Sequence, residues 1–197
     1  KNKKCQLRNA NRLMKYYFVR CMADTVTPQL GVEYAERLGI TSLVSQDQTL
    51  STALGGLTKG VSNLELTNAF AAIANGGTLM KPYMIDHVEN VGGQTVKKFL
   101  PSAYGTLMSA NDAQFLTHLM SQVVEIGTGS AMRGASYTVA GKTGSAEFET
   151  GKETHSWFVG FAPADKPKVA ICVLAEESGS GGQRTDTDIR SKVLCFF

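Results

Sequence analysis

No stretch of this sequence approaches the run of about 18 apolar residues that a membrane-spanning helix needs. The formal net charge is only +3, and no basic stripe interleaved with aromatic residues is present, which excludes a nucleic-acid-binding prediction. Four cysteines and three histidines are scattered without C-x-x-C spacing, so no metal site is expected and disulfide pairing is left open. With 43% hydrophobic and 19% charged residues, the 197-residue chain is typical of a folded, soluble protein.

Hydrophobic spacing divides the chain into helices followed by strands. Helical patterns cover the first forty residues up to Gly39, then 62–74, and then 109–126, whose wide apolar face includes Phe115 and Leu119. The expected strands are a peripheral hairpin at 84–88 and 94–99 and three neighbouring antiparallel runs at 137–145, 156–162 and 168–174. A closing helix is expected at 186–197.

This order predicts an α+β fold in which an antiparallel sheet is backed by helices. Residues 1–135 form the mainly helical portion with the peripheral hairpin. Residues 136–197 form the sheet strands and the C-terminal helix.

The segment that carries chemistry is Lys142-Thr143-Gly144-Ser145, at the end of an apolar strand and followed by a second strand that contains Trp157. K-T-G alone occurs by chance, but this strand context resembles the penicillin-binding protein and serine β-lactamase superfamily, whose third signature is K-T-G. Three upstream stretches also resemble the transpeptidase segments of peptidoglycan synthases, in the family's order. They are residues 53–62, 71–77 and 123–129.

The resemblance implies a partial serine-type D,D-transpeptidase domain over 1–197, which cross-links peptidoglycan and needs no cofactor. Its partners would be D-Ala-D-Ala-ended stem peptides and the β-lactams that mimic them. Lys142 would supply positive potential, and Thr143 and Ser145 would contact the ligand carboxylate, with the Ser145 N–H as an oxyanion donor. Gly144 would allow close backbone approach, and Trp157 would either wall the groove or pack within the sheet.

Two of the family's motifs have no counterpart here. No serine is followed by lysine three positions later, so the S-x-x-K nucleophile motif is absent. In the family this motif lies upstream, and the resemblance therefore implies that the N-terminal part of the domain precedes Lys1. The S-x-N motif is missing near residues 11–17, and the literal Ser109-Ala110-Asn111 is interpreted as a helix cap.

Three functions stay open at this point. The first is part of an acylating transpeptidase, the second is a non-catalytic scaffold derived from one, and the third, less favoured by the synthase-like segments, is a β-lactamase. The vacant S-x-N position favours the scaffold. The parent protein is expected to be membrane-anchored at the extracytoplasmic face of the bacterial membrane, with cell-wall synthesis partners, while this part of it is soluble.

Overall fold

The computed structural model describes residues 19–179, so the expected helix at 186–197 and the first 18 residues lie outside the described range. The chain divides into two compact units, one up to Glu65 and one from Leu66. The helical elements are η1 (Met22–Val26), α2 (Pro28–Arg37), η2 (Ser45–Asp47), η3 (Leu50–Leu54), α3 (Asn63–Ala74), α4 (Ala110–Glu125) and η4 (Ser130–Met132). The strands are β1 (Thr78–Met80), β2 (His87–Glu89), β3 (Thr95–Lys98), β4 (Ala103–Thr106), β5 (Ala140–Ala146), β6 (His155–Ala162) and β7 (Val169–Ala175).

Helix α2 of the first unit has a hydrogen-bonded N-terminal cap. The Thr27 hydroxyl accepts a hydrogen bond from the Leu30 N–H at 3.3 Å, and Pro28 takes a first-turn position where its missing N–H is not needed. Beyond the helix, Gly39 has a φ of 91°, a left-handed conformation that glycine adopts without strain. The predicted end of this helical stretch at Gly39 is confirmed.

A buried carboxylate holds the loops of the first unit together. Asp47 is 1% exposed and accepts hydrogen bonds from the Val44 N–H at 2.9 Å and from the Thr58 N–H and hydroxyl at 2.7 and 2.6 Å. The Thr58 hydroxyl, followed by the two backbone donors, lowers the pKa of Asp47. The carboxylate therefore stays charged and ties η2 to a loop that lies eleven residues further along the chain.

Glu65 has a similar role at the start of α3. One carboxylate oxygen accepts from the Thr41 N–H and hydroxyl at 2.8 and 2.6 Å, and the other accepts from the Ser62 N–H and hydroxyl at 3.0 and 2.8 Å. The Ser62 hydroxyl in turn accepts from the Glu65 N–H, which completes a capping box. The Thr41 hydroxyl is the largest of the causes that lower the pKa of Glu65 to about 2.

Helix α4 of the second unit begins at the predicted cap. The Ser109 hydroxyl accepts from the Asp112 N–H at 3.1 Å and donates to the Asp112 carboxylate at 2.7 Å. The predicted apolar face is only partly buried, because α4 packs along β5 with a narrower stripe that includes Met120. Phe115 and Leu119, expected on the buried face, are 61% and 46% exposed.

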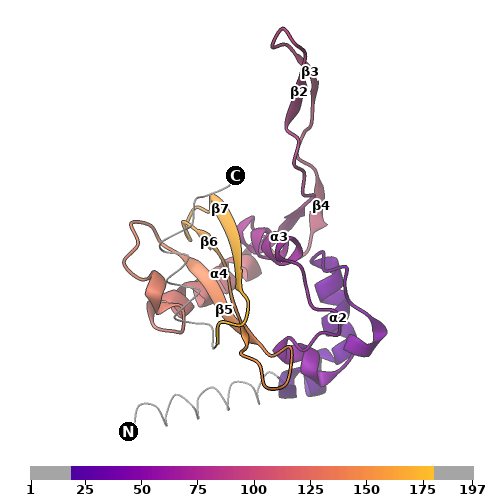
Figure 1. Cartoon of the computed structure of the whole chain (residues 1–197), viewed down its shortest axis with the longest axis vertical. Coiled ribbons are helices and arrows are strands. Elements are labelled where there is room, and N and C mark those ends of the chain that lie inside the picture. The colour runs from indigo at the N-terminus through magenta and orange to yellow at the C-terminus, as the bar shows by residue number, and fades with distance from the viewer. Residues whose placement is uncertain (1–18, 180–197) are drawn as a thin grey trace. The chain divides into compact units, whose positions relative to one another are not determined.

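Between α3 and α4 the chain runs out and back as two antiparallel strand pairs, β1 with β4 and β2 with β3 (Figure 1). The β2–β3 pair confirms the predicted peripheral hairpin. The register of each pair shifts once, between Leu79 and Met80 and between Val88 and Glu89.

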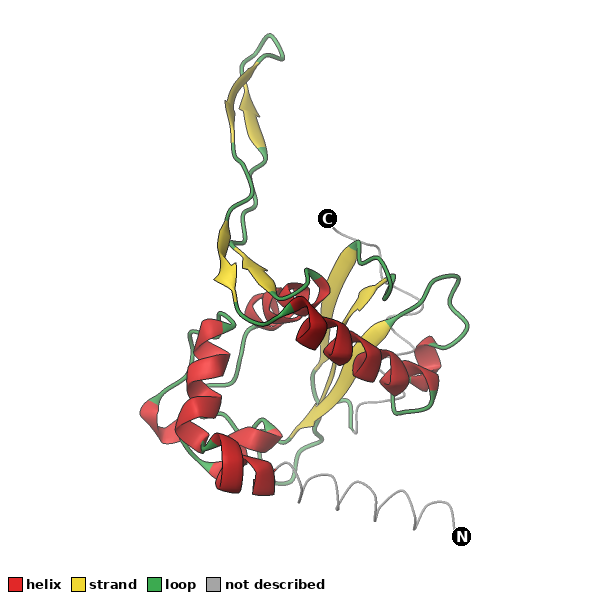
Figure 2. Cartoon of the chain, turned by 180° about the vertical axis from the view of Figure 1, so that it is seen from behind, coloured by secondary structure: helices red, strands yellow, loops and turns green. Residues whose placement is uncertain are grey.

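The main sheet consists of β5, β6 and β7 in that order, all antiparallel, which confirms the three predicted neighbouring strands. Its first strand begins at Ala140 rather than at 137, because Thr138 bonds instead to the turn after β6. Figure 2 shows α4 lying across β5. Phe161 is 1% exposed and packs against Ala140 of β5 and Met120 of α4, with partly buried residues of α3 around them.

The Glu65 network makes the stability of the chain depend on pH. The folded pKa of Glu65 lies at about 2, below its usual 4.5, so its contribution is fully present above pH 4.5 and is lost as the pH falls toward 2. Replacing Glu65 with Gln should lower the free energy of unfolding by about 1 kcal/mol at pH 7, since several charge-assisted bonds weaken at a partly exposed site. Urea unfolding of wild type and variant at pH 7 and pH 3 should show that this difference shrinks in acid. The exposed Glu36→Gln serves as control, and a Glu65→Gln difference independent of pH would contradict the prediction.

Candidate substrate-binding strand

The predicted site residues Lys142 to Ser145 all lie on β5. One edge of this strand is paired with β6, and within residues 19–179 no strand pairs with its other edge. An unpaired strand edge presents backbone N–H and C=O groups that an extended peptide can join as an additional strand. β5 therefore offers the backbone geometry that the sequence led us to expect of a substrate strand.

The register of β5 and β6 assigns the site residues to two faces of the sheet. Lys142 lies opposite Val159 and Gly144 opposite Trp157, so these four residues share one face. Thr143 lies on the other face, opposite Phe158, and Ser145 lies there opposite Ser156. The structure thus places all five predicted site residues within one short stretch of two paired strands, but it divides their side chains between two faces.

Lys142 is an exposed residue whose ammonium donates a hydrogen bond to the carbonyl oxygen of Thr143. The protein atoms packed around the side chain lower the pKa of Lys142 through desolvation. No carboxylate lies within ion-pair distance of this ammonium among the described residues. Its charge is therefore available to attract an anion at the edge of β5.

Thr143 is almost fully buried, with 7% of its surface exposed. Its hydroxyl oxygen lies 2.6 Å from the hydroxyl oxygen of Thr128, a hydrogen bond in which either group can donate. Thr128 follows α4 and was not among the predicted site residues. The only sequence signal for it is its position between Gly127 and Gly129, in a stretch that resembles transpeptidases.

Gly144 and Trp157 are in close contact across the two strands. A Cβ atom at Gly144 would lie 3.2 Å from the Trp157 Cβ, which is tighter than most such contacts, so glycine suits this position. Trp157 is half-buried, so both interpretations of it, as a wall of the groove and as a packing residue, are compatible with its burial. Ser145 is exposed at the end of the motif.

The connection from β5 to β6 is held by contacts around His155. Its ring stacks on Phe148 at a centroid distance of 4.0 Å, and its Nδ1 accepts a hydrogen bond from the Glu177 N–H at 3.1 Å. Lys152 lies over the other ring of the stack and forms an ion pair with Glu149 at 2.9 Å. These contacts fix the loop that follows the K-T-G segment to the chain just after β7.

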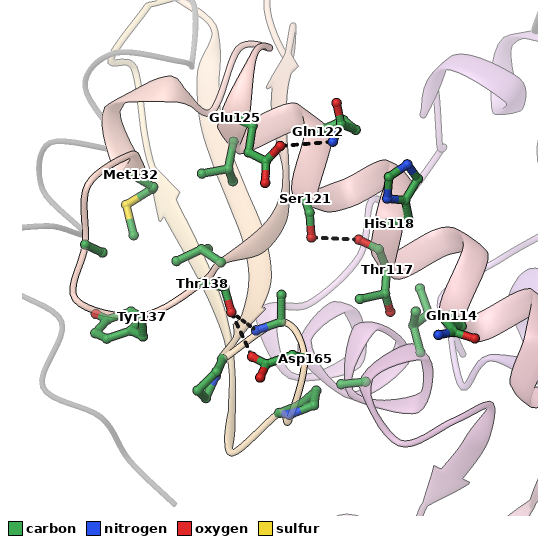
Figure 3. Close-up of a pocket in the computed structure, with 18 of the residues that line it drawn as sticks. Gln114, Thr117, His118, Ser121, Gln122, Glu125, Met132, Tyr137, Thr138 and Asp165 are labelled. Carbon is green, nitrogen blue, oxygen red and sulfur yellow. Dashed lines mark hydrogen bonds between the residues drawn. The ribbon is translucent and has the colours of Figure 1, made fainter.

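A cavity of about 1170 Å³ lies elsewhere, between α4, the segment 132–139 and the β6–β7 turn (Figure 3). Among its lining residues the Thr138 hydroxyl donates to Asp165 at 2.9 Å, and on α4 the Ser121 hydroxyl donates to the Thr117 carbonyl. None of residues 140–146 lines this cavity. We therefore place the candidate site at the edge of β5, where the lysine charge lies and where no strand among residues 19–179 is paired, rather than in this cavity.

Other kinds of site find little support in the described residues. Residues 19–179 contain no group of three or more His, Cys, Asp or Glu side chains arranged to hold a metal ion. Within the same range no helix is both long and apolar enough to cross a membrane. Burial raises the pKa of Cys172 on β7 to about 11, which keeps this thiol protonated and unreactive at neutral pH.

Comparisons with known proteins concern the family and the fold of the chain. A family model described as the penicillin binding protein transpeptidase domain matches residues 30–194, which includes the whole of β5 and its neighbours. The chain belongs to this family. Among curated proteins, it is 30% identical over 171 residues to the peptidoglycan D,D-transpeptidase PbpA of Mycolicibacterium smegmatis, covering 79% of this chain and 32% of the relative. The chain thus spans about a third of the length of that relative.

Solved structures of penicillin-binding proteins share the fold. The D,D-transpeptidase domain of a peptidoglycan glycosyltransferase from Eggerthella lenta superposes with a TM-score of 0.75 at 26% identity, covering 88% of this chain and 48% of that one. Penicillin-binding protein A from M. tuberculosis, in a ceftriaxone acyl-enzyme complex, gives a TM-score of 0.68 at 26% identity, covering 80% and 42%. The predicted family and the α+β fold class are both confirmed, for a chain that covers part of a penicillin-binding transpeptidase domain.

The register between β5 and β6 depends on glycine at position 160. A Cβ atom there would lie 2.4 Å from the Ala140 carbonyl oxygen and 2.8 Å from the Gly141 Cα, so backbone would have to move. Gly160→Ala should lower the free energy of unfolding by about 1–3 kcal/mol in urea unfolding. Gly92→Ala in the β2–β3 turn, where the nearest atom lies at 3.4 Å, is the matched control and should change it by less than about 0.5 kcal/mol. Equal midpoints for the two variants would show that the sheet accommodates a methyl group at position 160.

Proposed function

We propose that this chain is the substrate-strand part of a peptidoglycan D,D-transpeptidase that works through an acyl-serine intermediate. The observation that carries the proposal is the Lys142-Thr143-Gly144-Ser145 segment on β5, which is an edge strand of the sheet within residues 19–179, in a chain of the penicillin-binding transpeptidase family. A relative named as a peptidoglycan D,D-transpeptidase and a structural neighbour described as a ceftriaxone acyl-enzyme complex support it. We propose further that residues 1–197 all belong to one transpeptidase domain.

In this proposal β5 binds a stem peptide ending in D-Ala-D-Ala, or a β-lactam, as an added strand. Lys142 provides positive potential for the terminal carboxylate, and the hydroxyls of Thr143 and Ser145 donate hydrogen bonds to it. The Ser145 N–H stabilises the oxyanion that forms when the carbonyl is attacked. Gly144 permits close approach of the ligand backbone, and Trp157 borders the groove on the Lys142 face.

The reaction has two acyl-transfer steps. A serine hydroxyl attacks the carbonyl of the penultimate D-Ala, its proton is transferred to the leaving amine, and the terminal D-Ala departs. An amine of a second stem peptide then attacks the acyl-serine ester, forming the cross-link and regenerating the serine. Because no serine of this chain belongs to an S-x-x-K motif, we propose that the nucleophile comes from outside residues 1–197.

A non-catalytic scaffold derived from a transpeptidase is the second candidate, favoured by the missing S-x-N motif. In both cases we propose a protein anchored at the extracytoplasmic face of the bacterial membrane, with cell-wall synthesis partners. The two candidates differ in one measurable property, because only the enzyme forms a covalent adduct with a β-lactam.

Lys142 is the most direct test of the proposed site. In the protein as its gene encodes it, with whatever lies on either side of residues 1–197, Lys142→Ala should slow acylation by benzylpenicillin about ten- to a hundredfold, because one charge-assisted contact is lost. Stopped-flow or gel-based acylation rates measure this, and Lys166→Ala in the β6–β7 turn is the charge-matched control. An unchanged rate together with a large fall in melting temperature would show that Lys142 is structural.

The chain of residues 1–197 alone should form no covalent adduct with penicillin. Its strand can orient the ligand, but its serines have no activating lysine at the required spacing, and an unassisted hydroxyl is a poor nucleophile at neutral pH. Incubation with fluorescent penicillin, followed by denaturing gel and intact mass, should detect no label, while the complete protein should be labelled stoichiometrically. Label on the isolated chain that disappears when one serine is replaced would locate the nucleophile within it, and an unlabelled complete protein would favour the scaffold.

A further inference from the structure

We propose that Thr128 is a positioning residue, which orients the Thr143 hydroxyl so that it donates its proton to the carboxylate of the bound ligand. The inference deepens the proposed function and rests on it. It starts from the 2.6 Å contact between the two hydroxyls, which joins the loop after α4 to the K-T-G strand.

The backbone around Thr128 is held in place from both sides. Gly127 leaves no room for a side chain, since a Cβ atom there would lie 2.8 Å from the Val123 carbonyl oxygen. The Gly129 N–H donates to the same carbonyl oxygen at 2.9 Å, which closes the end of α4. Thr128 is therefore presented to β5 by a tight turn that α4 itself anchors, and α4 packs along β5.

The direction of the hydrogen bond follows from the number of protons available. A threonine hydroxyl has one proton and two lone pairs, whereas an ionised carboxylate has only acceptor sites. When Thr143 donates its single proton to a carboxylate, its bond with Thr128 persists only if Thr128 is the donor. The Thr128 proton is then donated to a lone pair of the Thr143 oxygen, and the Thr143 proton stays directed at the ligand. Accepting this hydrogen bond also polarises the Thr143 hydroxyl, which makes it a stronger donor.

The burial of Thr143 gives this orientation its effect. With 7% of its surface exposed, Thr143 has little access to water that could replace a missing partner. If Thr128 lost its hydroxyl, the Thr143 hydroxyl would be free to rotate toward other acceptors, and part of the ligand's binding free energy would be used to reorient it. Loss of one neutral hydrogen bond corresponds to about a three- to tenfold change in rate or affinity.

The test is a double-mutant cycle on the acylation rate of the complete protein with benzylpenicillin, using Thr128→Val, Thr143→Val and the double variant. We expect Thr128→Val to slow acylation about three- to tenfold and Thr128→Ser, which keeps the hydroxyl, to restore it to within about twofold. In the Thr143→Val background, Thr128→Val should have no further effect, because it acts only through Thr143. Thr117→Val is the matched control and should leave the rate unchanged, because the Thr117 hydroxyl donates to the Ala113 carbonyl within α4.

The outcomes separate this inference from the proposed function. The positioning role would be overturned if Thr128→Val slowed acylation equally in wild type and in the Thr143→Val background, or if it did not slow acylation of wild type at all. Either result would leave the transpeptidase proposal intact. Wild type that is not acylated in the same assay would overturn both. Urea unfolding of the four proteins of the cycle gives a second measurement: Thr128→Val should be less stable than the double variant, in which no buried hydroxyl lacks its partner.

Discussion

The pairing of β5 with β6 is the constraint on which the rest of this structure depends. Near the start of β5 two glycines, Gly141 and Gly160, lie directly opposite each other, and any side chain at position 160 would meet the backbone of β5. This close approach places Ala140 against Phe161 and Thr143 against Phe158, so the two largest buried aromatic residues of the sheet are positioned by the same register. A shift of one residue would move every side chain of the K-T-G segment to the opposite face.

This register places the side chains of the K-T-G segment on two different faces of β5. The charge of Lys142 lies on one face, the buried Thr143 hydroxyl lies on the other, and between them lies the edge of β5 that pairs with no strand among residues 19–179. A ligand joining the edge as a strand can therefore meet a cation, a hydroxyl donor and backbone donors at once. Phe158 and Phe161 of β6 each lie in a buried cluster of the core, and we propose that the opposite edge of β5 binds the ligand.

The buried carboxylate of Asp47, the Glu65 carboxylate and the Lys142 ammonium differ in the partners that surround them. Asp47 and Glu65 each receive several donors from backbone and hydroxyl groups, which lowers their pKa values and makes them structural anchors for loops. Lys142 has no such partner of opposite charge among the described residues, and its pKa is lowered by desolvation alone. The carboxylates of Asp47 and Glu65 are thus stabilised by donors within the fold, whereas a pKa lowered by desolvation, as at Lys142, is common among residues of functional sites.

Local patterns in the sequence were sufficient for much of this protein. Residues that are close in the sequence predicted the cap at Ser109, the helix end near Gly39, the β2–β3 hairpin and the three strands of the sheet. This is possible because the spacing of apolar side chains over a few residues distinguishes a helix from a strand. The K-T-G segment and its strand context were likewise sufficient to identify the family.

What only the tertiary structure decided depends on contacts between residues far apart in the chain. The sequence does not show that Thr143 is buried, that its hydroxyl meets Thr128 fifteen residues earlier, or that Phe115 is exposed on a helix whose pattern predicted burial. Hydrogen bonds such as that between Thr58 and Asp47 have no local signature either. These features arise because packing selects which side of a helix faces the sheet and which hydroxyls come within bonding distance, and that selection is made by the whole fold rather than by any one segment.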